Sequence, residues 1–438
     1  MLTLLEFEDF KSFRKAKMKL GPLNVVIGAN ASGKSNIRDA VRFLHGVSRS
    51  YTLAEIIGEK YAEGYLQWDG IRGGLKEICR AGTNHFSLAV GFRASGHNGA
   101  SGAVYHYRIG VTVDDTRAAP RVVQESLYRG ETLVFDSHPQ VSPPHQDDPM
   151  HVSVRLRGGG AYRKMGPRLK AISHQPVLTQ ILELARQRKL QGKIRDEVTE
   201  TLQELESVRF IDLSPEAMRK PSVPGQTALS DQGENLSSVL HSICQDPHLK
   251  SVLSSWIGEL TPMDVVDFDF VPDPQGKILV YLVEKSGRKT SAYSASDGTL
   301  RFLGILTALL GPKSSKFYFL EEIDNGIHPA RLYLLMNLLE ERTSEGKVQV
   351  FTTTHSPQLL RLIRGENWRS AAVTYRVEGV EEARIRSLPE VPHLMEVIRE
   401  ADIARLFEGG WMEQTMFFAE GEPAPVQTGP VEEHEGAR

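Results

Sequence analysis

The glycine-rich segment at residues 28–35 constrains the fold of this chain more than any other feature of its sequence. It reads GANASGKS and matches the pattern G-x-x-x-x-G-K-[S/T]. The apolar run before it, residues 23–27, is typical of a buried strand, and a helix is expected after it, from about residue 34 to residue 45. In such a strand–loop–helix unit, backbone N–H groups and the helix N-terminus converge on a phosphate. A plain glycine turn before a helix is the alternative interpretation.

The side chains of this segment predict an ATP site. Lys34 supplies a compact positive charge to the β- and γ-phosphates, and the Ser35 hydroxyl can reach Mg²⁺. ATP and Mg²⁺ are therefore the expected ligands. The residues predicted to bind ATP are Gly28, Ala29, Asn30, Ala31, Ser32, Gly33, Lys34, Ser35 and Asn36.

Two later segments supply candidate catalytic groups. The apolar run at residues 317–320 is followed by Glu321 and Glu322. We expect Glu321 to hold the water shell of Mg²⁺ and Glu322 to act as the general base that orients the attacking water. His355 follows the next apolar run, where a neutral imidazole can bind the γ-phosphate or that water. The alternatives are a solvated acidic loop and a structural histidine.

The segment SASDGTLRF, residues 294–302, precedes an expected helix. Ser296, Gly298 and the following N–H groups can bind a phosphate at the helix N-terminus. The alternative is an ordinary helix cap formed by Ser296 or Asp297.

The distribution of strands and helices predicts an α/β fold. Residues 86–135 read as antiparallel strands, whereas strands and helices alternate after residue 261, which is typical of a parallel sheet. We expect a head with a mixed central sheet and an antiparallel β-subdomain, interrupted by a mainly helical insertion. The predicted divisions are 1–157 for the first half of the head, 158–260 for the charged insertion, 261–418 for the second half and 419–438 for a disordered tail.

Composition points to a cytoplasmic protein without a membrane span. The formal net charge is −3, and the two cysteines, Cys79 and Cys244, have no metal-site or disulfide spacing. Acidic residues within the apolar N-terminal stretch argue against a signal peptide. The longest apolar run, residues 302–310, is about half the length that a membrane helix needs.

The order of these motifs resembles that of ABC-type ATPases of the RecF, SMC and OLD kind. GANASGKSN resembles their Walker A motif, SDGT their signature, LEEIDNGIHP their Walker B motif and D-loop, and TTTHSPQLL their switch-histidine segment. Two positions depart from the usual pattern, because Glu321 replaces an aspartate and Ala31 a glycine. The resemblance implies a homodimer or higher homo-oligomer, in which Ser296, Asp297 and Gly298 of one chain face the ATP held by Lys34 of another.

The resemblance leaves three assignments open. Gln67 is a weak candidate for the Q-loop, and a surface glutamine is the alternative. Lys11 and Arg14 can reach the nucleotide, as the N-terminal basic residues of SMC-like heads do, or lie on a solvated strand edge.

The insertion carries a basic segment, because residues 155–195 hold eleven lysines and arginines against one acid, Glu183. That excess favours contact with a DNA or RNA backbone. A solvated helix face, or a patch matched to the acidic residues that follow, is the alternative. The candidate nucleic-acid residues are Arg163, Lys164, Arg168, Lys170, Arg186, Arg188 and Lys189.

Three functions are compatible with these features. The resemblance implies an ATPase that dimerises around ATP and controls a separate, nuclease-like effector in antiphage defence. The alternatives are a RecF-like DNA-repair ATPase, and an ATPase scaffold that sequesters and releases a protein partner without binding nucleic acid. The roughly sixty residues that follow position 357 and are expected to fold are too few for the TOPRIM nuclease domain of OLD-like relatives.

Overall fold

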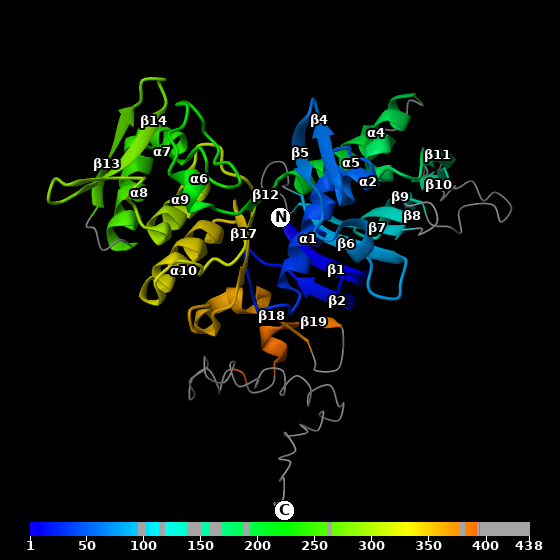
Figure 1. Ribbon diagram of the computed structural model, residues 1–438. Coiled ribbons are helices and arrows are strands. Elements are labelled where there is room, and N and C mark those ends of the chain that lie inside the picture. The colour runs from blue at the N-terminus through cyan, green and yellow to red at the C-terminus, as the bar shows by residue number, and fades with distance from the viewer. Residues whose placement is uncertain are drawn as a thin grey trace, which may run out of the picture.

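A six-stranded sheet forms the centre of the molecule (Figure 1). The computed structural model describes residues 1–94, 102–113, 119–137, 150–157, 168–187, 192–260, 265–376, 382–391 and 394. The order of the central strands is β12 (Val208–Ile211), β16 (Phe317–Leu320), β17 (Gln349–Thr354), β3 (Leu23–Ile27), β18 (Ala372–Arg376) and β19 (Ala383–Ser387). All neighbours pair in parallel except β18 and β19. The N-terminal strand β3 therefore lies between two strands from the last third of the chain.

The central strands are buried on both faces, so they separate two hydrophobic cores. Val25 and Ile27 of β3 pack into one core, while Val26 between them packs into the other, as the alternation of side chains along a strand requires. The first core contains the helices α7 (Leu236–Cys244), α8 (Pro247–Leu260), α9 (Asp297–Leu310) and α10 (Pro329–Ser344). The second contains α1 (Lys34–Ser48). Figure 1 shows α9 and α10 on the opposite side of the sheet from α1.

The second core is closed by an eight-stranded antiparallel sheet, as the sequence predicts for residues 86–135. Two helices, α4 (Val177–Gln187) and α5 (Gly192–Glu206), pack on each other, and α5 also contacts α1. The strand order of this sheet is β11 (Arg168–Ile172), β10 (His151–Leu156), β9 (Thr132–Asp136), β8 (Pro120–Arg129), β7 (Val104–Val113), β6 (His85–Arg93), β1 (Leu2–Phe10) and β2 (Phe13–Lys19).

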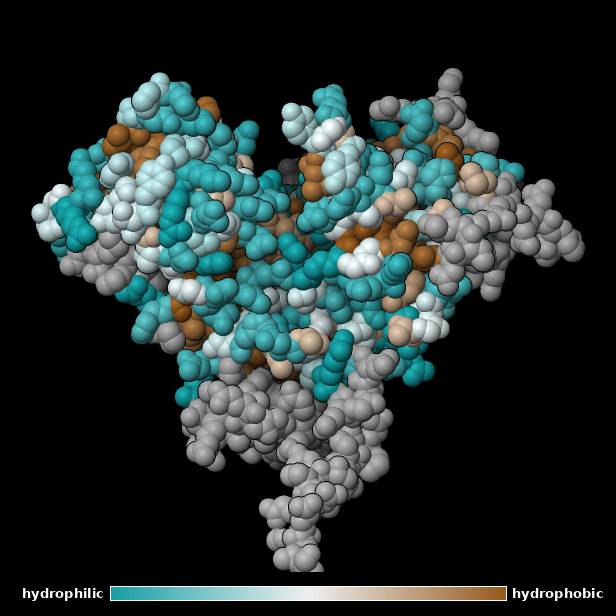
Figure 2. All heavy atoms as spheres, viewed as in Figure 1, coloured by the Kyte–Doolittle hydropathy of each residue, from teal (hydrophilic) through white to brown (hydrophobic). Residues whose placement is uncertain are grey.

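Each core, with the elements around it, forms one lobe of the molecule, and smaller elements complete both lobes. The lobe of the first core carries the sheet of β13 (Val265–Pro272), β14 (Ile278–Glu284) and β15 (Lys289–Ser291). The lobe of the second core carries the hairpin of β4 (Glu59–Ala62) and β5 (Tyr65–Asp69). The short helices are α2 (Leu53–Ile57), α3 (Gly74–Glu77) and α6 (Pro215–Met218). Figure 2 shows a notch between the lobes, and most of the residues visible along it are hydrophilic. Among the described helices, none combines the length and apolar character needed to cross a membrane.

The segment 158–260, which the sequence assigns to a mainly helical insertion, also contributes to both large sheets. Strand β11 extends the antiparallel sheet, and β12 pairs with β16 in the central sheet. The sequence also predicts a helix at residues 193–208, which takes in the first residue of β12, because the four residues VRFI are too few to show a periodicity of their own. Helices α4 and α5 lie between these two strands along the chain, whereas the predicted tail, 419–438, lies outside the described residues.

Candidate active site

The glycine-rich loop joins β3 to α1 and is seated on β18. The Ser32 Oγ lies 2.7 Å from the Thr374 Oγ1, and a Cβ atom added at Gly28 would lie 2.4 Å from the Thr374 carbonyl oxygen. Gly33, at the start of α1, has a φ of 107°, and Ala31 has a φ of 61°. Position 31 therefore needs the left-handed conformation that glycine adopts freely, which explains why a glycine there would be equally suitable.

The Lys34 side chain is buried inside this loop. It is 6% exposed, and its ammonium donates hydrogen bonds to the carbonyl oxygens of Gly28 (2.6 Å) and Ala29 (2.7 Å). Burial lowers the Lys34 pKa to about 8, against the opposing effect of the carboxylates of Glu322, Asp324 and Glu321. A buried ammonium whose positive charge is only partly balanced by nearby carboxylates is suited to binding an anion.

His355 connects Lys34 to Glu322. The His355 Nδ1 lies 3.1 Å from the Lys34 ammonium, and its Nε2 lies 2.9 Å from the Glu322 Oε1. A neutral ring with its proton on Nε2 satisfies both contacts, because it then accepts from the lysine and donates to the carboxylate. Glu322 has a φ of 46°, and its N–H donates to the Thr353 Oγ1 at 3.1 Å. Since β3, β17 and β16 are parallel neighbours, their carboxyl ends bring the three groups together.

Glu321 lies beside two arginines that the sequence analysis did not identify. The Arg38 Nε is 3.3 Å from the Glu321 Oε2, and the Arg72 Nη2 is 4.0 Å from its Oε1. Burial raises the Glu321 pKa, and the two guanidinium groups oppose that effect. Arg38 follows Lys34 by one helical turn, a spacing that would have indicated its side of α1. No local signal marks Arg72, which reaches the site from the loop after β5.

The oxygen groups next to the loop suit a divalent cation. Ser35 is exposed, and Arg72 donates to its carbonyl oxygen at 2.5 Å, so the Ser35 residue and the Glu321 carboxylate lie on the same side of α1. Hydroxyl and carboxylate oxygens are ligands that Mg²⁺ accepts when phosphates and water complete its octahedron. These residues therefore fit the cation that accompanies a bound nucleotide.

The other sequence candidates near the loop have different environments. Lys11 pairs with the buried Asp39 at 2.9 Å, while Arg14 is exposed and lies 3.9 Å from the Glu382 carboxylate. Lys11 lines a hollow of about 420 Å³ with Asn36. Gln67 is exposed on β5, and no contact connects it with the loop among the described residues.

The SDGT segment lies at the N-terminus of α9, across the central sheet from α1. The Ser296 side chain accepts from the Thr299 N–H at 3.2 Å and caps the helix. Asp297 pairs with Arg219 at 2.6 Å, and a Cβ atom at Gly298 would lie 2.2 Å from the Gly326 carbonyl oxygen. No hydrogen bond or ion pair connects residues 296–298 with residues 28–36 in the part of the chain that the structure describes.

The sequence of this chain also matches a known family. The sequence model of the family described as "AAA domain, putative AbiEii toxin, Type IV TA system" matches residues 23–85 and 107–361. The chain belongs to this family. The prediction of an ABC-type ATPase of the RecF, SMC and OLD kind is thereby confirmed at the level of the family, as is the α/β head with its antiparallel sheet by the topology above.

A relative and two solved structures are also similar. An "ATP/GTP phosphatase" of Helicobacter pylori (strain ATCC 700392 / 26695) is 24% identical over 132 residues, which are 30% of this chain and 34% of that protein. The match thus spans about a third of the relative's length. An SMC head bound to the C-winged helix domain of ScpA has a TM-score of 0.46 at 13% identity, covering 88% of this chain and 98% of that chain. The SMC head domain of Thermotoga maritima has a TM-score of 0.39 at 13% identity, with the same two coverages.

The basic segment is only partly available for nucleic acid. Arg168 and Lys170 are exposed on β11, at the edge of the antiparallel sheet, and Arg186 lies on α4. Two further cations of the segment are paired within the protein, since Arg155 lies 3.2 Å from Asp136 and Arg157 lies 2.8 Å from Glu197. The remaining candidates, Arg163, Lys164, Arg188 and Lys189, lie outside the described residues.

Proposed function

We propose that this chain binds and hydrolyses ATP at the loop formed by residues 28–36. The observation that carries the proposal is the pair of hydrogen bonds that links Lys34 to His355 and His355 to Glu322, at the carboxyl ends of three neighbouring strands. Lys34 would exchange the carbonyl oxygens of Gly28 and Ala29 for oxygens of the β- and γ-phosphates. The Nε2–H of His355 would then turn from Glu322 to the γ-phosphate, and Glu322 would accept a hydrogen bond from the attacking water instead and orient it.

The same geometry supports a site for the cation. Ser35 and Glu321 would hold Mg²⁺, which neutralises charge on the phosphate oxygens when bound. Glu321 is longer than the usual aspartate, and Arg38 and Arg72 hold its carboxylate beside α1.

Hydrolysis by three purified proteins tests the assignment. Wild type is expected to release phosphate from ATP, whereas Lys34→Ala fails to bind nucleotide and Glu322→Gln binds it without turnover. Glu345→Gln, which removes an exposed carboxylate paired with Lys347, is the matched control and should keep wild-type activity. Full turnover by Glu322→Gln would show that another group orients the water.

We further propose a homodimer, or a higher homo-oligomer, that closes around ATP. Support comes from the position of Ser296 and Gly298 at the end of α9, across the central sheet from Lys34 of the same chain. A second chain would bring its own SDGT segment to the bound γ-phosphate. Light scattering with ATP should give a stable dimer for Glu322→Gln and a monomer for Glu322→Gln combined with Ser296→Arg. Equal masses with and without the second substitution would contradict the proposal.

The biological role that we propose is a nucleic-acid-linked switch that controls a separate, nuclease-like effector in antiphage defence. The family description names a toxin and a toxin–antitoxin system, which supports a defence role. Exposed Arg168 and Lys170 at the edge of β11 support contact with DNA or RNA. A RecF-like repair ATPase, and a scaffold that binds only proteins, are the alternative functions.

Nucleic-acid binding separates these functions. Duplex DNA and RNA should stimulate hydrolysis and bind more weakly as salt increases. The double change Arg168→Glu with Lys170→Glu should reduce both effects, while Lys285→Glu, at an exposed lysine after β14, should not. If DNA and RNA neither bind nor stimulate hydrolysis, the result would favour the scaffold that binds only proteins. A nuclease recovered with the chain would favour defence over repair.

A further inference from the structure

A hollow of about 240 Å³ lies where the edges of the two large sheets meet. Strand β2 ends the antiparallel sheet, β19 ends the central sheet, and the two strands contact each other (Figure 1). We propose that this hollow binds phosphates of a nucleic-acid strand and thereby tightens ATP binding at residues 28–36. The inference rests on the proposed nucleic-acid-linked function, to which it adds a site at the edge opposite β11.

The hollow carries an excess of positive charge. Among its described lining residues, the cations are Arg14 and Lys15 of β2 and Arg384 and Arg386 of β19. One acid, Glu382, accompanies them, and its carboxylate lies 3.9 Å from Arg14 and 3.9 Å from Arg80. A single carboxylate is thus shared by two guanidinium groups, in a chain whose formal net charge is −3. An anionic ligand would complete the balance of charge here.

The floor of the hollow is a buried tyrosine. Tyr375 of β18 is 2% exposed and lies opposite Arg384 in the β18–β19 pairing. Its hydroxyl accepts a hydrogen bond from the Arg386 guanidinium. A guanidinium group held in one orientation can direct two N–H donors at the oxygens of a phosphate, and it loses little conformational freedom in doing so.

A row of lysines extends the hollow along β2. Lys15, Lys17 and Lys19 alternate with buried apolar residues, so all three point to the outer face of the antiparallel sheet. Successive lysines are about 7 Å apart along the strand, a spacing that suits the linked phosphates of an extended nucleic-acid strand. Lys17 lies 2.9 Å from Glu6, whereas no ion pair involves Lys15 or Lys19 in the part of the chain that the structure describes.

The strands around the hollow also support the glycine-rich loop. Phe13, Thr374 and Ala383 each precede a residue that lines the hollow. The Thr374 Oγ1 lies 2.7 Å from the Ser32 Oγ. A Cβ atom added at Gly33 would lie 3.0 Å from the Ala383 Cβ and 3.1 Å from the Phe13 ring. Neighbouring residues of the same three strands therefore face the loop and the hollow.

This arrangement links the two sites physically. A nucleic-acid strand bound to both β2 and β19 would hold together the segments on which the loop is seated. A nucleotide bound to the loop would, in turn, fix the same segments from the other side. Coupling of this kind is reciprocal, so each ligand should strengthen the binding of the other.

Oligonucleotide binding tests the inference without relying on turnover. The affinity for a fluorescent oligo(dT) of about 20 nucleotides, longer than a typical single-strand site, is measured by anisotropy at several salt concentrations. Lys15→Gln with Arg384→Gln removes two cations of the hollow. The slope of log affinity against log salt should fall by about 1.4 in this double variant, which corresponds to two phosphate contacts on a single strand.

Two matched variants complete this measurement. Lys15→Arg with Arg384→Lys keeps both charges and should keep the wild-type slope. Lys285→Gln with Lys313→Gln removes two exposed lysines that lie outside the hollow, and it should also keep that slope.

A second measurement follows the link to the loop. For wild type, oligo(dT) should lower the Kd of a non-hydrolysable ATP analogue by about 5-fold or more. Lys15→Gln with Arg384→Gln should abolish this shift. Without oligo(dT), this double variant should bind the analogue as wild type does, because neither residue belongs to the loop at residues 28–36.

Several outcomes would overturn the inference. An unchanged salt slope or an unchanged shift in Lys15→Gln with Arg384→Gln would do so, and so would weaker analogue binding without oligo(dT), which would assign the hollow to the ATP site. Equal competition by thymidine monophosphate, at the same phosphate concentration, would show that no linked strand is needed. If wild type binds duplex DNA but no oligo(dT), the inference fails alone. If it binds neither, the proposed nucleic-acid-linked function fails as well.

Discussion

Replacing the buried lysine of the loop should make the nucleotide-free protein less sensitive to pH. Lys34 has an ordinary pKa of 10.5 that burial lowers to about 8, so the unfolded chain holds this proton more tightly than the folded chain does. At 1.36 kcal/mol for each pKa unit, that difference corresponds to about 3 kcal/mol of unfolding free energy. The stability is present above pH 10.5 and is lost as the pH falls through 8.

The comparison with Lys34→Met isolates this effect from other groups that titrate in alkali. Urea unfolding of both proteins is followed at pH 7, 8 and 9.5 without nucleotide. Between pH 7 and 9.5, wild type should gain about 2 kcal/mol relative to Lys34→Met, which has no proton to lose at this position. With ATP at pH 7, wild type should have the larger free energy of unfolding of the two proteins, because only the protein that binds ligand is stabilised by it.

A stability difference that stays constant from pH 7 to pH 9.5 would refute the reasoning. It would mean that the carbonyl oxygens of Gly28 and Ala29, together with the nearby carboxylates, fully compensate the buried ammonium. The strength of the site for phosphate would then have to come from the backbone N–H groups of the loop rather than from Lys34.

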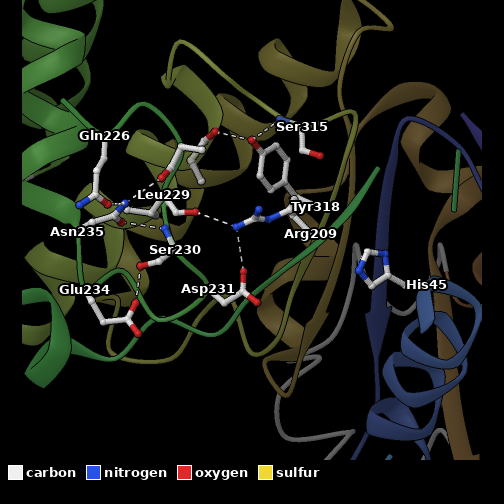
Figure 3. A network of polar contacts seen from close by, with 12 residues as sticks. His45, Arg209, Gln226, Leu229, Ser230, Asp231, Glu234, Asn235, Ser315 and Tyr318 are labelled. Carbon is white, nitrogen blue, oxygen red and sulfur yellow. Dashed lines mark hydrogen bonds and ion pairs between the residues drawn. The ribbon is translucent and has the colours of Figure 1, made fainter. Parts of the chain in front are cut away.

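Three other changes test the glycine-rich loop and two other parts of the fold. Gly28→Ala should destabilise the protein by about 1–3 kcal/mol in urea unfolding and impair nucleotide binding, because the added methyl group meets the backbone of Thr374 at 2.4 Å. Glu125 is fully buried and accepts hydrogen bonds from the first N–H groups of α4, and burial raises its pKa to about 7. Wild type should therefore lose stability as the pH rises from 5 to 8, and Glu125→Gln should not. Arg209→Ala removes the donor to Asp231 (Figure 3), and hydrogen exchange should become faster across residues 226–235.

The parts of the fold that could be predicted are those with strong local signals. The strands Leu23–Ile27 and Phe317–Leu320 have the bounds expected from their apolar runs, because turn residues or charges end each run. The order of the motifs was sufficient to anticipate that Lys34, Glu322 and His355 meet, since parallel strands end at one edge.

Other contacts between segments that lie far apart in the sequence could not be predicted. Arg72 reaches Glu321 from a loop after β5, and β12 joins the sheet after a long excursion through the antiparallel sheet. The basic segment shows the same difficulty, because Arg157 is neutralised by Glu197, forty residues later. The charged residues can be counted in a sequence, but which of them form ion pairs depends on which elements pack together.

The position of β3 between β17 and β18 has a consequence for biosynthesis. The Leu2 N–H donates to the Gln349 side chain across a sequence separation of 347 residues, and β3 finds its neighbours only after a similar length has been made. At about 5–20 residues per second, the ribosome needs roughly 20 to 70 s to supply them. During that interval the strand that precedes the phosphate-binding loop has open edges on both sides. The nascent chain is therefore exposed to aggregation at its future active site, and the loop gains its full support only after β17 and β18 have been made.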